Sequence, residues 1–199
     1  MNKTRQAIIN TAKELFGKNG MKNTTMHDIS ATSGKSRRTL YIYFKNKNEI
    51  LDAIIEEELA CVINAIEGAA KLELEPVDKF VAYVVTRMNV VREVVQRNGS
   101  LGADFFKDVI RVERCRRKLE RIEINLLKAI LQEGCDKKVF FFNNIDQVSI
   151  FTHFVIRGID VPYIRGVFDE PGSDKNGSLK RKTLTILYGL LNSGKEVNK

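Results

Sequence analysis

Two adjacent arginines, Arg37 and Arg38, stand in a short basic stretch that is rich in hydroxyl-bearing side chains. A guanidinium can donate two parallel hydrogen bonds to O6 and N7 of a guanine, and it can also neutralise a phosphate. Tyr41 follows one helical turn later and can contact a base or a thymine methyl group, or it can pack inward. These residue types predict a DNA-binding surface on which the arginines either read bases or contact phosphate only.

Two short helices and a tight turn, over about residues 25–44, would hold these side chains outward. Thr25, with Asp28 three residues later, has the spacing of a capping box at the start of the first helix. Gly34 permits the positive φ that the turn of a helix-turn-helix requires. Ser36 is expected to cap the second helix rather than to read a base, and the apolar residues of that helix recur at a spacing that faces a core.

The charge of the chain is concentrated at its N-terminal end. Residues 1–47 contain ten Lys and Arg against two acidic residues, so they account for the whole net charge of +8. The other 152 residues contain equal numbers of acidic and basic side chains. Such a local excess is typical of a module that binds phosphates. A solvated basic face without a partner is the alternative.

A longer set of residues extends this motif: Thr25, Asp28, Ile29, Gly34, Ser36, Thr39, Leu40, Tyr41, Tyr43, Phe44, Lys45, Asn46, Lys47, Glu49 and Leu51. The set resembles the DNA-binding domain of the tetracycline-repressor (TetR) family, over about residues 2–62. Three positions depart from the family pattern. Ser30 stands where alanine is usual, Lys35 where a small apolar residue is usual, and Arg38 where Gly, Ala or Pro is usual.

The resemblance implies which side chains contact DNA. Thr39, Tyr43 and Lys47 match positions that hold phosphates, and Lys47 also lies at a helix N-terminus that favours an anion. Thr25 and His27 would contact the flanking backbone. The complete predicted DNA-binding set is Thr25, His27, Ser36, Arg37, Arg38, Thr39, Tyr41, Tyr43 and Lys47.

The whole chain is predicted to be all-α, with about nine helices. A three-helix DNA-binding domain over residues 2–62 would be joined by a long helix, from about 46 to 71, to a helical domain over residues 63–199. The next helix would begin near Pro76 and end before Asn98, because the Asn-Gly pair there favours a break. The resemblance implies that the second domain binds a small-molecule effector and dimerises.

Candidate effector contacts come from charged and aromatic residues that share helical faces. Tyr83 and Arg87 lie one turn apart, as do His153 and Arg157. The predicted pocket set is Phe80, Tyr83, Arg87, Phe105, Phe106, His153, Phe154 and Arg157, although each of these can equally be plain core or surface. Arginines over residues 111–121, interleaved with acids that include Glu123, are predicted to form a solvated face.

The last two predicted helices carry broad apolar faces that exceed the needs of one interior. We therefore expect dimerisation through them, with a candidate interface of Phe151, Val155, Leu187, Leu190 and Leu191.

Enzyme classes find little support in the sequence. Its two histidines, His27 and His153, lie in different predicted domains, and the P-loop, G-x-S-x-G and G-x-G-x-x-G patterns are absent. No metal or cofactor is expected. The three cysteines are far apart and indicate a reducing compartment, and no apolar run is long enough for a membrane helix, so a cytoplasmic protein is predicted.

The expected protein is a transcriptional regulator, most often a repressor in this family, that binds a palindromic operator as a homodimer. A small-molecule effector in the second domain would release it from double-stranded DNA. The alternative is a helical adaptor or RNA-binding protein that uses its basic domain for backbone contact alone and shows little sequence preference.

Overall fold

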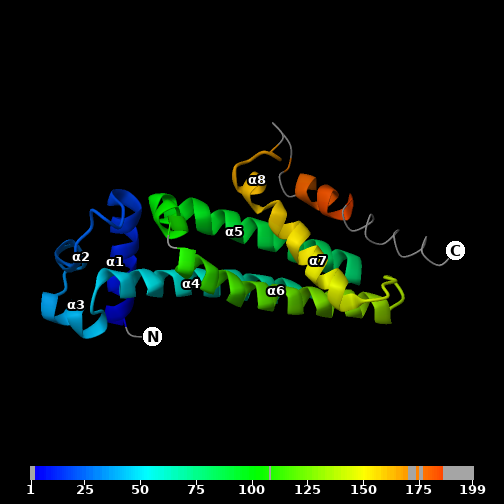
Figure 1. Cartoon of the computed structure of the whole chain (residues 1–199), viewed down its shortest axis with the longest axis horizontal. Helices are drawn as coiled ribbons and strands as arrows, with labels where there is room; N and C mark the ends of the chain where they lie inside the picture. The colour runs from blue at the N-terminus through cyan, green and yellow to red at the C-terminus, as the bar shows by residue number, and fades with distance from the viewer. Residues whose placement is uncertain (1–2, 108, 170–173, 175–176, 186–199) are drawn as a thin grey trace. The chain divides into compact units, whose positions relative to one another are not determined.

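The computed structural model describes residues 3–107, 109–169, 174 and 177–185, with the side chains of residues 99–116 left outside that description. The described helices are α1 (Lys3–Asn19), α2 (Met26–Ser33), α3 (Arg37–Tyr43), α4 (Lys47–Ala70), α5 (Pro76–Lys107), α6 (Val109–Asp136), α7 (Ile145–Gly158) and α8 (Asp160–Ile164) (Figure 1). Residues 177–185 are also helical, and none of the described residues forms a strand. The predicted all-α class is confirmed, and the predicted count of about nine helices is close.

The chain divides into two compact units, each made of two chain segments. Unit 1 comprises residues 1–60 and 94–115, and unit 2 comprises residues 61–93 and 116–199. The boundary predicted near residue 62 falls within α4, close to where the two units divide that helix. The sequence did not predict that each unit consists of two separate stretches of the chain.

The helix-turn-helix of unit 1 forms through the predicted local interactions. Thr25 Oγ1 accepts a hydrogen bond from the Asp28 amide at 3.2 Å, and Asp28 Oδ2 accepts one from the Thr25 amide at 2.8 Å. Gly34 ends α2 with φ of 64°, a left-handed conformation that favours glycine. Ser36 Oγ accepts from the Thr39 amide at 3.0 Å and so caps α3.

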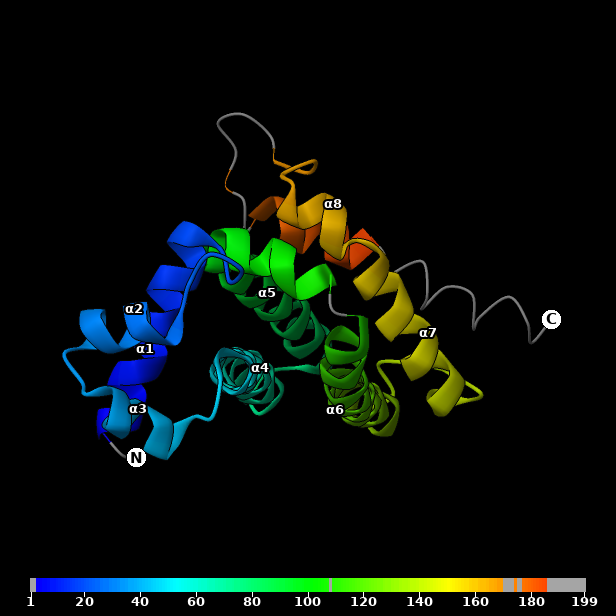
Figure 2. The same cartoon turned by 60° about the vertical axis from the view of Figure 1, so that its left-hand side comes forward.

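The core of unit 1 contains residues from α1, α2, α3 and α4. Helices α1, α2 and α3 lie close together in Figures 1 and 2. Ile8, Phe16, Ile29, Leu40 and Ile50 are fully buried in it. Burying side chains of this size stabilises a fold by about 1.5–3 kcal/mol each. This core fixes the orientation of α3, because Leu40 belongs to α3 itself.

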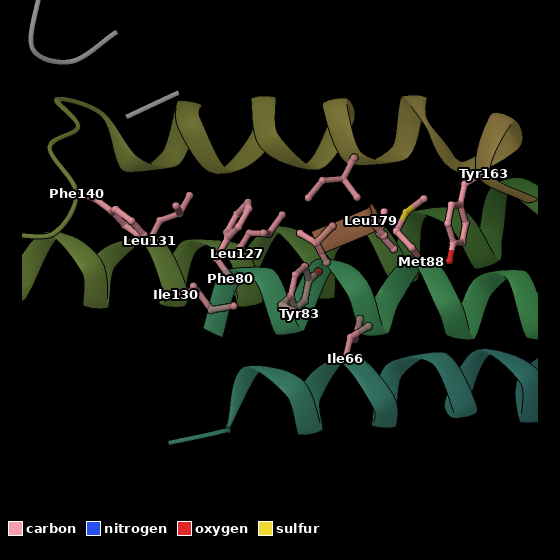
Figure 3. Close-up of a cluster of buried hydrophobic side chains, with 12 residues drawn as sticks. Ile66, Phe80, Tyr83, Met88, Leu127, Ile130, Leu131, Phe140, Tyr163 and Leu179 are labelled. Atoms are coloured by element: carbon pink, nitrogen blue, oxygen red, sulfur yellow. The ribbon is translucent and has the colours of Figure 1, made fainter. Parts of the chain in front are cut away.

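The core of unit 2 is drawn in Figure 3, where apolar side chains converge from several helices. It includes Phe80, Leu127 and Phe140, which are at most 1% exposed. Phe140 lies in the connection after α6 and packs so closely on Gly134 that a Cβ there would lie 2.0 Å from its ring. Phe140 is therefore buried, whereas its neighbours Val139 and Phe141 are 36% and 53% exposed.

The predicted end of a helix before Asn98 is wrong, since α5 continues to Lys107. Asn98 is 7% exposed, and its side-chain amide donates to the Val94 carbonyl at 2.6 Å, one turn back. This bond lets the asparagine stay within the helix. A glycine inside a helix costs only about 1 kcal/mol relative to alanine, which the surrounding packing can offset.

Candidate nucleic-acid interface and effector site

Four exposed side chains of α3 form a surface that we call the reading face: Arg37, Arg38, Tyr41 and Ile42. Tyr41 is 53% exposed, so it does not pack in the core of unit 1. Ile42 is 72% exposed beside it. A capped helix that presents two guanidinium groups, a phenol and an aliphatic side chain offers the contacts that base edges in a major groove accept.

The turn before α3 is closed by a residue that departs from the family pattern. Ser30 is buried, and its hydroxyl donates to the Lys35 carbonyl at 2.7 Å. The Lys35 amide donates in return to the Ser30 carbonyl at 3.2 Å. This pair of hydrogen bonds ties the two ends of the turn together, and Lys35 remains only partly buried.

The flanking residues of the predicted set lie on or near the surface. Thr25 and His27 are exposed at the start of α2, whereas Thr39 and Tyr43 are half-buried. The hydroxyl of Thr39 lies 2.8 Å from that of Ser36. Hydrogen bonds from the side chain and the backbone of Thr25 hold the pKa of the Asp28 carboxyl below its usual range. The carboxylate therefore remains charged, and it serves the cap of α2.

The hydrogen bonds of Lys47 within unit 1 were not predicted from the sequence. Its ammonium group donates to the carbonyls of Met21, Lys22 and Thr24, at 2.8, 3.3 and 3.1 Å. A lysine has three N–H donors, so all of them are engaged. A direct contact of this ammonium with phosphate would require it to release a carbonyl. The geometry gives Lys47 the role of holding the loop between α1 and α2.

Unit 2 contains a chain of ionisable side chains, Asp160–Arg87–Glu123–His153, which we call the buried polar chain. Arg87 Nε donates to Glu123 at 2.5 Å, and its two terminal nitrogens donate to Asp160 at 2.5 and 3.1 Å. His153 Nδ1 lies 3.1 Å from the other oxygen of Glu123. Arg87, Glu123 and His153 are at most 3% exposed. The chain links helices α5, α6, α7 and α8.

Arg87 and Glu123, the two central members of this chain, stabilise each other's charged forms. Burial alone would raise the pKa of Glu123, but hydrogen bonding from His153 and the Arg87 guanidinium hold it below its usual value. Burial would likewise lower the pKa of Arg87, and the charges and hydrogen bonds of Glu123 and Asp160 raise it instead. Tyr83 has a strongly raised pKa, first because it is buried and next because Glu123 is near. Tyr83 is therefore neutral.

The structure brings together only part of the predicted pocket set. Phe80, Tyr83, Arg87 and His153 are buried in unit 2. Phe154 is 51% exposed and does not line an interior site. Arg157 is on the surface side of α7, where it pairs with Glu120 at 3.1 Å. The side chains of Phe105 and Phe106 lie outside the described residues.

The predicted dimer interface is described only on α7. There Phe151 is 58% exposed and Val155 is half-buried. Leu187, Leu190 and Leu191 lie outside the described residues.

Three functional candidates were missed or misassigned by the sequence. Glu123 was predicted on a solvated face, yet it is 1% exposed. Its position is decided by Arg87 and His153, which are distant in sequence, so local patterning gave no signal. Asp160 was missed for the same reason. Ile42 was detectable, because an isoleucine stands among the outward positions of a short helix whose inner face was already assigned.

Other kinds of site find no support in the part of the chain that the structure describes. Within it, no group of three or more His, Cys, Asp or Glu side chains could hold a metal ion. Cys61 and Cys135 form no disulfide there, and no described helix is long and apolar enough to cross a membrane.

Comparison with known proteins matches residues 8–54 to the model of bacterial regulatory proteins of the tetR family. A similar protein is the uncharacterised HTH-type transcriptional regulator YfiR of Bacillus subtilis, 29% identical over 68% of this chain and 68% of the relative. The probable acrEF/envCD operon repressor of Escherichia coli K12 is 24% identical, over 72% of this chain and 67% of the relative.

A solved structure extends the likeness in fold beyond the matched domain. A tetR-family regulatory protein from Rhodococcus RHA1 aligns over 96% of this chain and 98% of its own, with a TM-score of 0.68 at 19% identity. The matched residues 8–54 contain the helix-turn-helix and the reading face. The chain therefore carries a DNA-binding domain of the tetR family, and it is a DNA-binding transcriptional regulator.

Proposed function

We propose that this protein is a ligand-responsive repressor that binds a palindromic operator as a homodimer. The observation that carries the proposal is the reading face, in which Arg37, Arg38, Tyr41 and Ile42 are exposed on a helix whose other side is fixed in a core. A rigid helix with exposed donors can discriminate base pairs, whereas a flexible basic tail contacts phosphates alone. The sense of regulation follows the relative described as a probable operon repressor.

A second copy of the chain is the proposed partner of α7. Ile150, Phe151 and Phe154 of α7 and Val161 of α8 are between 43% and 58% exposed. Exposed apolar patches of this kind mark interaction sites in soluble proteins. A homodimer would bury them and present two reading faces, which matches the two half-sites of a palindrome.

Effector control is proposed to act through unit 2. A ligand can release DNA only if it binds one conformation of the protein better than another. The buried polar chain joins four helices, so a ligand that contacts it can alter how these helices pack. The DNA contacts themselves would remain unchanged.

Selection of bound duplexes from a random pool tests the DNA-binding part of the proposal. We expect an enriched sequence with two-fold symmetry, bound about 10³-fold or more tightly than unrelated duplexes. Repeating the selection with Arg37→Ala and Arg38→Ala together should abolish the enrichment, whereas Lys45→Ala should retain it. Equal binding to all duplexes by the unaltered protein would favour the adaptor alternative.

Sedimentation tests the proposed dimer. Phe151→Glu should shift the protein toward monomer, because a charge would be buried against an apolar surface. Gln132→Glu adds the same charge at an exposed polar position of α6, outside this patch, and should leave the dimer intact. A dimer of unchanged strength in Phe151→Glu would show that α7 is not the interface.

A further inference from the structure

Three fully buried polar atoms of unit 2 have no hydrogen-bond partner within the described part of the chain. They are Tyr83 Oη, Thr152 Oγ1 and His153 Nε2. Their side chains are 0%, 0% and 2% exposed. Such atoms are uncommon in folded proteins, because a buried donor or acceptor without a partner loses the hydrogen bonds that it made with water. Their concentration on α5 and α7 therefore needs an explanation.

Two of these side chains, His153 and Tyr83, lie near one carboxylate, that of Glu123. His153 uses Nδ1 toward Glu123, so its Nε2 is on the opposite side of the ring. Tyr83 lies near enough to Glu123 and Arg87 for both charges to act on its hydroxyl. Thr152 adjoins His153 on α7. Tyr83 of α5 and His153 of α7 thus approach the same acidic group, and Thr152 stands next to His153 in the sequence.

The charge of this region restricts what can bind there. The guanidinium of Arg87 is engaged on both sides by Glu123 and Asp160. One guanidinium is thereby set against two carboxylates, which leaves an excess of negative charge when the imidazole is neutral. An anionic group would be repelled and would find the donors of Arg87 already in use.

The hydrogen-bonding capacity of the three atoms adds a second restriction. In a neutral imidazole whose Nδ1–H faces Glu123, Nε2 is an acceptor. The hydroxyls of Tyr83 and Thr152 can donate or accept. A complementary head group must therefore donate at least one hydrogen bond. The neighbouring core, including Phe80 and Leu127 (Figure 3), is apolar and favours a hydrophobic remainder.

We infer that Tyr83, Thr152 and His153 form a ligand site for an amphipathic molecule whose head group donates a hydrogen bond and carries no negative charge. An amine or an alcohol on an apolar body satisfies both restrictions. The site deepens the proposed effector control and rests on it for its regulatory meaning.

Three probes that share one apolar body test the head-group requirement. They are 4-phenylbutylamine, 4-phenylbutanol and 4-phenylbutyrate, each titrated into the full-length protein by calorimetry and by thermal shift. We expect saturable binding of the amine and the alcohol. The carboxylate should bind at least about tenfold more weakly, a difference of about 1.4 kcal/mol.

Two tyrosine variants provide a matched pair. Tyr83→Phe removes the hydroxyl without a described partner, whereas Tyr163→Phe removes one that donates to Asn89 at 2.5 Å. Tyr83→Phe should leave the free protein as stable as before or more so, and should weaken amine binding about three- to tenfold. Tyr163→Phe should lower the melting temperature and leave probe affinity unchanged. His153→Phe should weaken binding as Tyr83→Phe does.

Each result decides the inference. It is overturned if 4-phenylbutyrate binds as tightly as the amine, if no probe binds saturably, or if Tyr83→Phe and His153→Phe both leave affinity unchanged. Binding to the selected duplex with and without the amine separates it from the proposed function. If the amine binds through Tyr83 and His153 but duplex affinity does not change, the ligand site stands and effector control fails.

Discussion

The reading face of α3 and the buried polar chain of unit 2 use the same kind of side chain in opposite ways. Arg37 and Arg38 are exposed on a short helix, in a segment whose charge is strongly positive. Arg87 is 3% exposed, and its guanidinium is shared between two carboxylates from other helices. A guanidinium near solvent retains its donors for an external partner, whereas a buried one must satisfy them within the protein.

This difference teaches that residue type alone does not identify a ligand contact. From the sequence, Arg38 was named as a candidate DNA contact and Arg87 as a candidate effector contact. Burial and pairing distinguish the two arginines. The guanidinium of Arg38 is exposed to solvent, whereas that of Arg87 is paired with Glu123 and Asp160. Five measurements can test whether burial and pairing distinguish the two kinds of arginine.

Removal of the buried guanidinium should have the largest effect. Arg87→Met leaves Glu123 and Asp160 without their partner and should lower the free energy of unfolding by about 3–5 kcal/mol. Arg157→Met, which breaks the partly exposed pair with Glu120, should cost about 0–1 kcal/mol. Urea denaturation of both variants measures the two losses. Equal losses would mean that burial does not distinguish the two arginines.

Acid should remove a smaller share of the same stability, because protonation of Glu123 leaves its volume and part of its hydrogen bonding intact. The pKa of Glu123 is lowered in the folded protein, so its contribution is present above the unfolded value of about 4.3 and is lost as pH falls through the folded pKa. The stability difference between the unaltered protein and Glu123→Gln should be constant above that pH and shrink below it. A difference independent of pH would show that ionised Glu123 contributes nothing.

Lys47 tests whether a cation of unit 1 can be structural. Lys47→Met should destabilise the protein by about 1.5–3 kcal/mol, because hydrogen bonds from a charged donor are lost. Lys45→Met, at an exposed neighbouring position, should be nearly neutral. If Lys47 instead contacts phosphate, its loss should reduce the salt slope of DNA binding by about one unit per contact. We expect its salt slope to stay unchanged.

Arg37 and Arg38 distinguish base reading from phosphate binding. A bidentate contact with guanine should make either alanine variant cost about 1–3 kcal/mol on the selected site. Preference should also flatten at one base pair in each half-site. Binding to single-base variants of the site, at several salt concentrations, separates this result from uniform weakening. Uniform weakening would assign both arginines to phosphates and leave specificity to Tyr41, its neighbours or DNA shape.

The smallest effect is expected from Ile42, which we propose contacts a thymine methyl group. Replacing one thymine of the selected site by deoxyuridine should cost about 0.8 kcal/mol, the value of one buried CH₂ group. In Ile42→Ala the same replacement should cost almost nothing, because the partner of the methyl group is already gone. Additive losses at every thymine would remove Ile42 from the reading face.

Local features of the molecule were determined by the sequence alone. The capping box of Thr25 and Asp28, the left-handed Gly34 and the cap at Ser36 depend on residues at most three positions apart, or on one residue's own φ. Their geometry follows from steric limits and nearby hydrogen bonds, which the sequence specifies directly. The all-α class and the helix-turn-helix formed by α2 and α3 could be predicted for the same reason.

Only the tertiary structure decided which charged side chains are buried and where a helix continues past a local signal for its end. Glu123 meets Arg87 and His153 across 36 and 30 positions, and Asp160 meets Arg87 across 73. Lys47 reaches carbonyls 23 to 26 positions earlier, and α5 continues through Asn98 where the local signal favoured a break. Such outcomes depend on which helices pack together, because burial and pairing are properties of the assembled core and are absent from any short segment of the chain.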